Sequence, residues 1–152
     1  MSRASDVEAV VLASRALLAV VAKTISPALE ELSLPQFRVL VVLVGAGPHR
    51  VGALAERLGA VTSTFSRAVD RLEAAGWVSR EPNPDSRREV IVTATEAGRE
   101  LVERVTRLRR EELTAILETL PDEDLRSVAA SFRRFADAAG EPAIEDLLPL
   151  GG

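Results

Sequence analysis

Residues 51–76 of the 152-residue chain read VGALAERLGAVTSTFSRAVDRLEAAG, and this stretch determines the expected fold. Apolar residues at helical spacing predict a short helix over residues 51–58, which Gly59 ends. Thr62 is the expected cap of a second helix over residues 63–75. Two short helices joined by so tight a turn are typical of a helix-turn-helix.

The second of these helices has one apolar and one polar face. Phe65, Val69 and Leu72 recur at i, i+4 and i+7, which predicts that they pack on a core. The polar residues suit a DNA major groove, because small hydroxyls avoid clashes and guanidinium groups bind base edges or phosphates. The candidate DNA contacts are Thr62, Ser63, Thr64, Ser66, Arg67, Asp70 and Arg71. An ordinary helical hairpin with a solvated polar face is the alternative.

The next segment predicts a two-stranded ribbon. Residues 77–80 and 90–93 resemble short strands, and EPNPDSRRE at 81–89 is typical of a hairpin loop. A ribbon directly after a helix-turn-helix is the layout of a winged helix. An arginine on a wing can enter the minor groove, so the candidate wing contacts are Arg80, Ser86, Arg87 and Arg88. The alternative is a solvated loop whose positive charge Asp85 and Glu89 dilute.

Two helices are expected before this region. Apolar spacing predicts a long helix over residues 6–32, kinked or broken near residues 23–26 because Pro27 interrupts it. Ser33 and Gln36 have the spacing of a capping box for the second helix. That helix contains the apolar run FRVLVVLV, which indicates a central, buried position.

Two more helices are expected after the ribbon. Thr95 caps a long helix to about Leu120, and Pro121 opens the last one, in which Phe132 and Phe135 share an apolar face. Apolar residues make up 47% of the chain but aromatics only 3%, which favours helices over a β-sandwich. The expected fold class is mainly α with a small β-hairpin wing, a winged helix-turn-helix with additional N- and C-terminal helices.

The composition argues against several classes of protein. There is no cysteine and one histidine, His49, so disulfides, thiolate catalysis and a Cys- or His-rich metal site are not expected. Without a phosphate-binding glycine loop, no catalytic constellation or cofactor site is apparent. The sequence shows no run of about 18 apolar residues, so no membrane span is expected. Asp6 and Glu8 stand where a signal peptide has basic residues, which indicates a cytoplasmic protein.

The charge of the chain is unevenly distributed. The net charge is −4, which by itself argues against a nucleic-acid partner. Residues 50–99, however, contain eight basic and seven acidic groups, whereas residues 100–152 contain seven and twelve. Local charge acts on phosphates more strongly than a distant acidic lobe at physiological salt, so DNA remains the expected partner.

The sequence resembles the multiple-antibiotic-resistance-regulator (MarR) family over nearly its whole length. The resemblance rests on LPQFRVLVVL (34–43), ALAERLG (53–59), TSTFSRAVDRLEAAGWVSR (62–80) and PDSRREVIVTATEAGREL (84–101). The family pattern has Asp-x-Arg at the wing tip and a Leu-Thr-x-x-Gly helix start. Aligned on Thr95 and Gly98, Arg88 takes the position of the wing arginine. Ser86 falls where the acidic partner is expected, with Asp85 adjacent to it, and Ala94 replaces the leucine.

The resemblance implies a homodimer that binds a pseudo-palindromic operator in double-stranded DNA. It implies a DNA-binding lobe over residues 34–95 within a single subunit of residues 1–152. Residues 6–32 and 100–148 would dimerise; the alternative is that these helices cap the core of their own subunit.

The resemblance also implies that the protein is a repressor released by a small aromatic or acidic ligand. His49, Arg15, Lys23 and Arg38 are candidates to meet a ligand carboxylate, although solvated or salt-bridged roles are the simpler interpretation. The alternative function is a winged-helix protein-interaction module without DNA binding, which the nearly neutral recognition segment keeps open.

Overall fold

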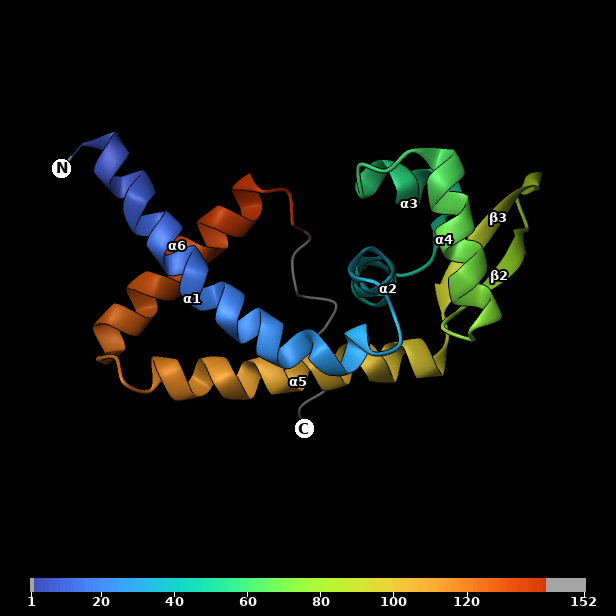
Figure 1. The fold of residues 1–152 in the computed structure, drawn as a ribbon. Helices are drawn as coiled ribbons and strands as arrows, with labels where there is room; N and C mark the ends of the chain where they lie inside the picture. Colours follow the sequence, from blue (N-terminus) through green and yellow to red (C-terminus); the bar gives the residue numbers. More distant parts are fainter. Residues whose placement is uncertain (1, 142–152) are drawn as a thin grey trace.

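Residues 2–141 are described by the computed structural model, and they form six helices and one small antiparallel sheet (Figure 1). Residues 142–148 of the expected dimerisation segment lie outside the described residues. The predicted mainly α fold with a small β wing is confirmed. In chain order the elements are α1 (Arg3–Leu29), α2 (Leu34–Ala46), β1 (His49–Arg50), α3 (Val51–Arg57), α4 (Thr62–Ala74), β2 (Val78–Asn83), β3 (Ser86–Ala94), α5 (Glu96–Leu117) and α6 (Asp122–Ala138).

A kink or break was expected near residues 23–26, and helix α1 passes through Pro27 without a break. A proline in a helix leaves the carbonyl four residues earlier without its usual N–H donor. Here that carbonyl belongs to Lys23, and the Ser26 hydroxyl donates to it at 3.4 Å. The helix also ends at Leu29, two residues after the proline. A local substitute donor and a nearby helix end therefore accommodate Pro27.

Helix α1 is also long and apolar enough to cross a membrane, judged by length and composition alone. Its most apolar 18-residue window has a mean hydropathy of 1.7, although Arg15 and Lys23 leave no uninterrupted apolar run of that length. The C-terminal part of the helix packs in the protein, where Val20, Thr24, Ile25 and Ala28 are buried.

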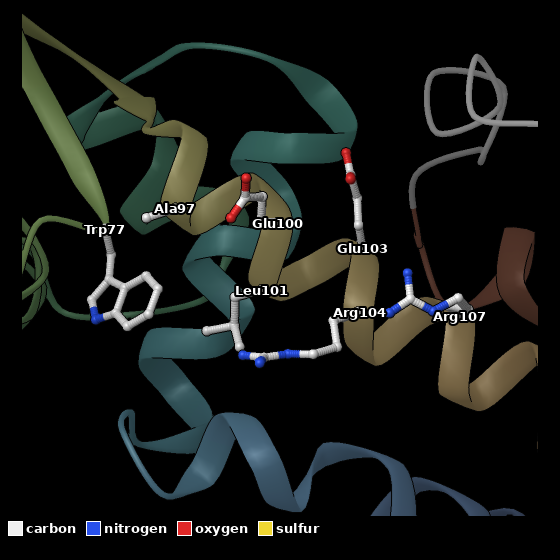
Figure 2. Close-up of a pocket in the computed structure, with 7 residues that line it drawn as sticks. All are labelled: Trp77, Ala97, Glu100, Leu101, Glu103, Arg104 and Arg107. Carbon is white, nitrogen blue, oxygen red and sulfur yellow. The ribbon is translucent and has the colours of Figure 1, made fainter.

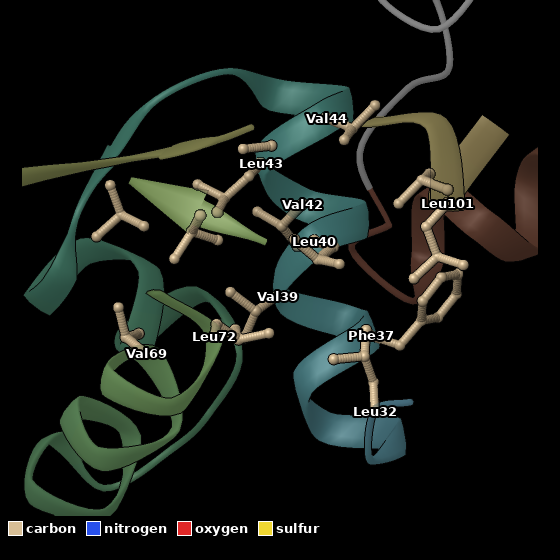
Figure 3. Packing of buried hydrophobic residues seen from close by; sticks show 14 of the residues in the cluster. Leu32, Phe37, Val39, Leu40, Val42, Leu43, Val44, Val69, Leu72 and Leu101 are labelled. Atoms are coloured by element: carbon tan, nitrogen blue, oxygen red, sulfur yellow. The ribbon is translucent and has the colours of Figure 1, made fainter. Parts of the chain in front are cut away.

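Helix α2 lies at the centre of the core, as its apolar run predicted (Figure 3). The predicted capping box is confirmed: the Ser33 hydroxyl accepts from the Gln36 N–H, and the Gln36 side chain accepts from the Ser33 N–H. Val39 and Leu43 are among its buried side chains, together with Leu40, which is fully buried. Helices α1, α4 and α5 all contact α2. The helix that the sequence places at the centre therefore packs against elements from both the N-terminal and the C-terminal parts of the chain.

The sheet has three strands in the order β1-β3-β2, and β1 was not predicted. Strand β1 contains only His49 and Arg50, which pair antiparallel with Val92 and Ile91 of β3. A two-residue strand has no periodicity to detect, so its position depends on a partner about 40 residues away in the chain. The strand ties the start of α3 to the base of the wing.

Gly98 allows α5 to approach the wing closely. The N-terminus of α5 is capped as predicted, with the Thr95 hydroxyl accepting from the Gly98 N–H and donating to Gly76 O. A Cβ at position 98 would overlap the Trp77 carbonyl oxygen and lie 3.1 Å from Leu40 Cδ2. Gly98 therefore lets the helix backbone contact the start of the wing directly.

Substituting Gly98→Ala should lower the free energy of unfolding by about 1–3 kcal/mol, because the added methyl forces backbone apart in a packed region. Urea denaturation followed by circular dichroism measures this change. Gly52→Ala is the matched control, because Gly52 lies in α3 with open space around its missing Cβ. That control should leave stability unchanged or raise it by up to about 1 kcal/mol. Equal stabilities of the two variants would show that the approach at Gly98 is not tight.

Helices α1 and α6 expose apolar faces in the single chain. Helix α6 has no buried residue, and Phe132 and Phe135 are 42% and 61% exposed. On α1, before its buried C-terminal part, Val7 and Leu18 are 54% and 66% exposed. Figure 1 shows these segments beyond the winged lobe, with α5 running between the two regions. Helix α6 therefore contributes no buried residue to the core of the described chain, whereas the C-terminal part of α1 and the N-terminal part of α5 do.

Candidate nucleic-acid interface

Helix α4 packs on the core through the predicted face. Phe65, Val69 and Leu72 are at most 5% exposed, and Figure 3 shows Val69 and Leu72 directed at the cluster around α2. The helix begins one residue earlier than predicted, since Val61 is its N-cap and Thr62 its first residue. Thr62 therefore does not cap the helix, and no side-chain hydrogen bond does. A buried apolar face and tertiary packing define this start more than local capping does.

The polar residues of α4 divide into two strips. Ser66, Asp70 and Glu73 follow one another at i, i+4 and i+7 beside strand β2. The second strip is exposed to solvent and contains Ser63, Thr64, Arg67 and Arg71. The sequence grouped Ser66 and Asp70 with the second strip, whereas the structure places both against the wing.

Arg80 of β2 holds the first strip. Its Nη1 lies 2.6 Å from Asp70 Oδ1 and 3.0 Å from Glu73 Oε2, and its Nη2 donates to the Ser66 carbonyl at 3.5 Å. Only 23% of the Arg80 side chain is exposed. Of the predicted contact residues, Arg80 thus binds the Asp70 carboxylate and the backbone carbonyl of Ser66.

The wing is longer and its turn shorter than the sequence indicated. Strand β2 ends at Asn83 and β3 begins at Ser86, so only Pro84 and Asp85 form the turn. The predicted nine-residue loop at 81–89 is therefore wrong, because partner strands extend the pairing into a segment whose composition is typical of loops. Ser86 lies opposite Asn83 at the start of β3.

The arginines of the wing occupy an irregular part of the ribbon. The register changes from Pro82 opposite Val90 to Asn83 opposite Ser86, so residues 87–89 fall within the shift. Arg87 and Arg88 are exposed, and neither has an ion-pair partner within residues 2–141. A bulge of this kind redirects side chains away from the regular alternation of a strand.

A polar network orders the wing tip where the expected acidic residue is replaced by Ser86. The buried Asn83 donates through Nδ2 to Glu89 Oε2 at 2.9 Å, and its Oδ1 accepts from the Asp85 N–H at 3.0 Å. Glu89 Oε1 in turn accepts from Arg50 of β1 at 3.1 Å. All three strands are joined in this way. Sequence reasoning missed Asn83 and Glu89; the Asn-Pro-Asp run, typical of a turn in which Asn bonds its own backbone, was the available signal.

The ligand candidates other than Arg15 have partners within the subunit. Lys23 Nζ pairs with Glu112 Oε1 on α5 at 2.5 Å, and Arg38 lies 3.9 Å from Glu141. His49 Nδ1 is 2.8 Å from Gly47 O, and its Nε2 is 3.3 Å from Arg57 Nη1. Arg15 is exposed. For Lys23 and Arg38 the simpler salt-bridged interpretation agrees with the structure.

One open cavity of about 410 Å³ lies between the start of the wing and α5 (Figure 2). Trp77 forms one wall, and α5 contributes Ala97, Glu100, Leu101, Glu103, Arg104 and Arg107.

Arg109 lies further along α5 and is partly buried. Its Nε donates to the buried Thr24 hydroxyl at 3.4 Å, and burial lowers the pKa of its guanidinium below the usual value. Within the described part of the chain, no group of three acidic or histidine side chains is placed to hold a metal ion.

Comparison with known proteins agrees with this geometry. The model of the MarR family matches residues 32–90, which include α2 to most of β3. The HTH-type transcriptional regulator YwoH of Bacillus subtilis, itself uncharacterised, is 33% identical over 101 residues, which are 66% of this chain and 72% of that protein. The chain belongs to the MarR family. The resemblance found in the sequence is therefore confirmed.

A second relative and a solved structure are also similar to this chain. The uncharacterised HTH-type transcriptional regulator YfiV of Bacillus subtilis is 33% identical over 98 residues, which are 64% of this chain and 61% of YfiV. The match thus spans less than two thirds of that regulator. The crystal structure of RV1404 from Mycobacterium tuberculosis is 37% identical and has a TM-score of 0.82, covering 94% of this chain and 97% of that one. The whole arrangement of helices and wing is therefore shared with a solved structure.

Proposed function

We propose that this MarR-family chain is a sequence-specific transcriptional regulator that binds double-stranded DNA, and that it is not an enzyme. The observation that best supports this function is the position of two pairs of exposed arginines. Arg67 and Arg71 lie on α4, and Arg87 and Arg88 lie on the wing. Figure 1 shows the start of α4 and the β2–β3 turn at the same end of the lobe. A helix and a ribbon so arranged suit a major groove and the adjacent minor groove.

The proposed direct contacts are a subset of the residues that the sequence indicated. Helix α4 would contribute Thr62, Ser63, Thr64, Arg67 and Arg71, and the wing would contribute Arg87 and Arg88. Arg80 binds Asp70 and the backbone carbonyl of Ser66, and Ser86 lies opposite Asn83 in the strand register at the wing turn, so we assign these four residues to support.

The charge of the site predicts a moderate salt dependence. Four arginines on α4 and the wing strands lack an ion-pair partner among the described residues: Arg67, Arg71, Arg87 and Arg88. A dimer would then offer at most eight such groups. The slope of log K against log salt should be no steeper than about −7, since each phosphate contact contributes about 0.9. Binding should depend on a few placed arginines more than on a broad basic surface.

The exposed apolar faces of α1 and α6 support a homodimer, in which residues 6–32 and 100–148 form the dimerising lobe and residues 34–95 the DNA-binding lobe. A two-fold dimer presents two recognition helices to successive major grooves about 34 Å apart, so the operator should be a pseudo-palindrome. Burial of α1 against the second subunit would also explain the high mean hydropathy of this helix, so a membrane is not needed to explain it. We place the protein in the cytoplasm, where its DNA is.

Repression and release by a ligand are further parts of the proposal, and they rest on the family resemblance. A small aromatic or acidic ligand that binds between the two lobes would shift the population of dimers away from the DNA-competent form.

A mobility-shift assay with promoter DNA adjacent to the protein's own gene tests the proposed function. Fragments selected from random DNA provide the operator if the promoter does not contain it. We expect specific, salt-dependent binding with a symmetric footprint. Absence of specific binding to both DNA pools would favour the alternative of a protein-interaction module.

Arg67→Ala should weaken operator binding by about 1–3 kcal/mol per contact if the guanidinium binds a base edge. Discrimination between the operator and a sequence mutated at one position should fall at the same time. Gel-shift titrations with both DNAs measure these effects, with Arg126→Ala on α6 as the control. An equal loss on every sequence would reassign Arg67 to a phosphate contact.

A further inference from the structure

Arg80 is the side chain that joins the wing to the recognition helix. It projects from the middle of β2, where it lies opposite Val92 of β3. Its guanidinium contacts two carboxylates and one carbonyl of α4, and these groups are spaced over two helical turns at Ser66, Asp70 and Glu73. Three contacts over that length restrain both the distance and the angle between helix and wing.

The charge around Arg80 makes it a poor DNA ligand. Two carboxylates lie within 3.0 Å of the same Nη1 atom, so the cluster of three groups has a net charge of −1. The exposed fraction of the Arg80 side chain is 23%, against 59% for Asp70 and 40% for Glu73. A phosphate would have to displace or approach these carboxylates, which repel it.

We propose that Arg80 is a positioning residue that holds the wing and α4 in the relative orientation that DNA requires. This inference rests on the proposed function and assigns Arg80, Asp70 and Glu73 a role different from direct contact. Binding through two separate elements is strongest when both are held in the bound geometry beforehand, because ordering them on binding costs free energy.

The double variant Asp70→Asn, Glu73→Gln distinguishes the two roles of Arg80 by the sign of its effect. Removing two negative charges beside DNA would strengthen binding if Arg80 were a direct contact, because Arg80 would be released to bind a phosphate. A positioning role predicts the opposite result. We expect the affinity for operator DNA to fall about tenfold, within the range for residues of one ion-pair network.

A double-mutant cycle completes the test. Arg80→Gln alone should lower the affinity by about the same factor, and should have little further effect in the Asp70→Asn, Glu73→Gln background. Arg80→Lys should restore only part of the affinity, because an ammonium lacks the planar fork that reaches several partners. Fluorescence anisotropy with full-length protein and operator DNA measures all affinities, and thermal melting confirms that each variant is folded.

The outcomes separate this inference from the proposed function. If the unmodified protein fails to bind DNA, the proposed function fails. If it binds and the Asp70→Asn, Glu73→Gln variant binds as tightly or more tightly, the positioning role is overturned. Additive losses in the cycle would overturn it as well, because they would show that Arg80 acts independently of its partners on α4.

Discussion

Phe132→Glu should convert the proposed homodimer into monomers and lower the affinity for operator DNA by about 10²–10⁴-fold, the usual gain from linking two binding modules. Phe132 is 42% exposed in the single chain and lies on a helix without a buried residue. A carboxylate there would be buried against apolar side chains of the second subunit, which strongly disfavours association. The isolated subunit should remain folded, because its core does not contain α6.

Sedimentation or light scattering measures the change of mass, and anisotropy titration measures the change of affinity. Ser127→Glu is the matched control, because it introduces the same charge on the exposed, opposite side of α6. We expect that control to remain dimeric and to bind DNA normally. A dimeric Phe132→Glu protein would refute the assignment of this face to the interface, and a protein that melts at a much lower temperature would indicate that α6 stabilises its own subunit.

Arg88→Ala should weaken operator binding about tenfold or more while the melting temperature stays nearly unchanged. Arg88 is exposed, lies in the irregular part of β3 and lacks an ion pair within residues 2–141, so its removal breaks no described contact. An arginine in a narrow minor groove responds to its enhanced negative potential. The side chain occurs twice in a dimer, so the salt slope should become shallower by about 1.8 if each copy contacts one phosphate.

The measurement is a salt series of operator titrations on both proteins. Arg110→Ala, exposed on α5, is the control for loss of one surface charge per subunit. A large drop in melting temperature of Arg88→Ala would reveal a structural role for Arg88. Unchanged affinity together with an unchanged slope would mean that the wing does not contact DNA.

The sequence predicted the helices well where the signal was local, such as a capping residue or an apolar face within the helix itself. The capping box at Ser33, the Thr95 cap and the apolar face of α4 depend on residues within two turns of each other, and the structure confirms all three. Of the kink or break expected near residues 23–26, the break does not occur, because the neighbouring Ser26 hydroxyl bonds the freed carbonyl.

The candidate site was only partly visible in the sequence. Helical spacing identified which side of α4 is buried, but not which side of the remaining surface meets β2. That distinction depends on Arg80, which lies seven residues beyond Glu73 and reaches back across a turn to bind it. The length of the wing was likewise underestimated, because strand pairing overrides the turn-forming composition of residues 81–89.

The motifs of the sequence indicated the family by resemblance. The sequence by itself also determined the order of the helices and of the two wing strands, the central position of α2 and the exposed arginines on α4 and the wing. Those properties follow from local spacing, capping and residue type, which act over a few residues. Only the tertiary structure decided that β1 joins the sheet, that Asn83 and Glu89 order the wing tip, and that Arg80 binds the helix. These features depend on contacts between segments that are distant in the sequence. Whether a guanidinium is available to bind a phosphate depends on whether a carboxylate lies beside it in the folded chain.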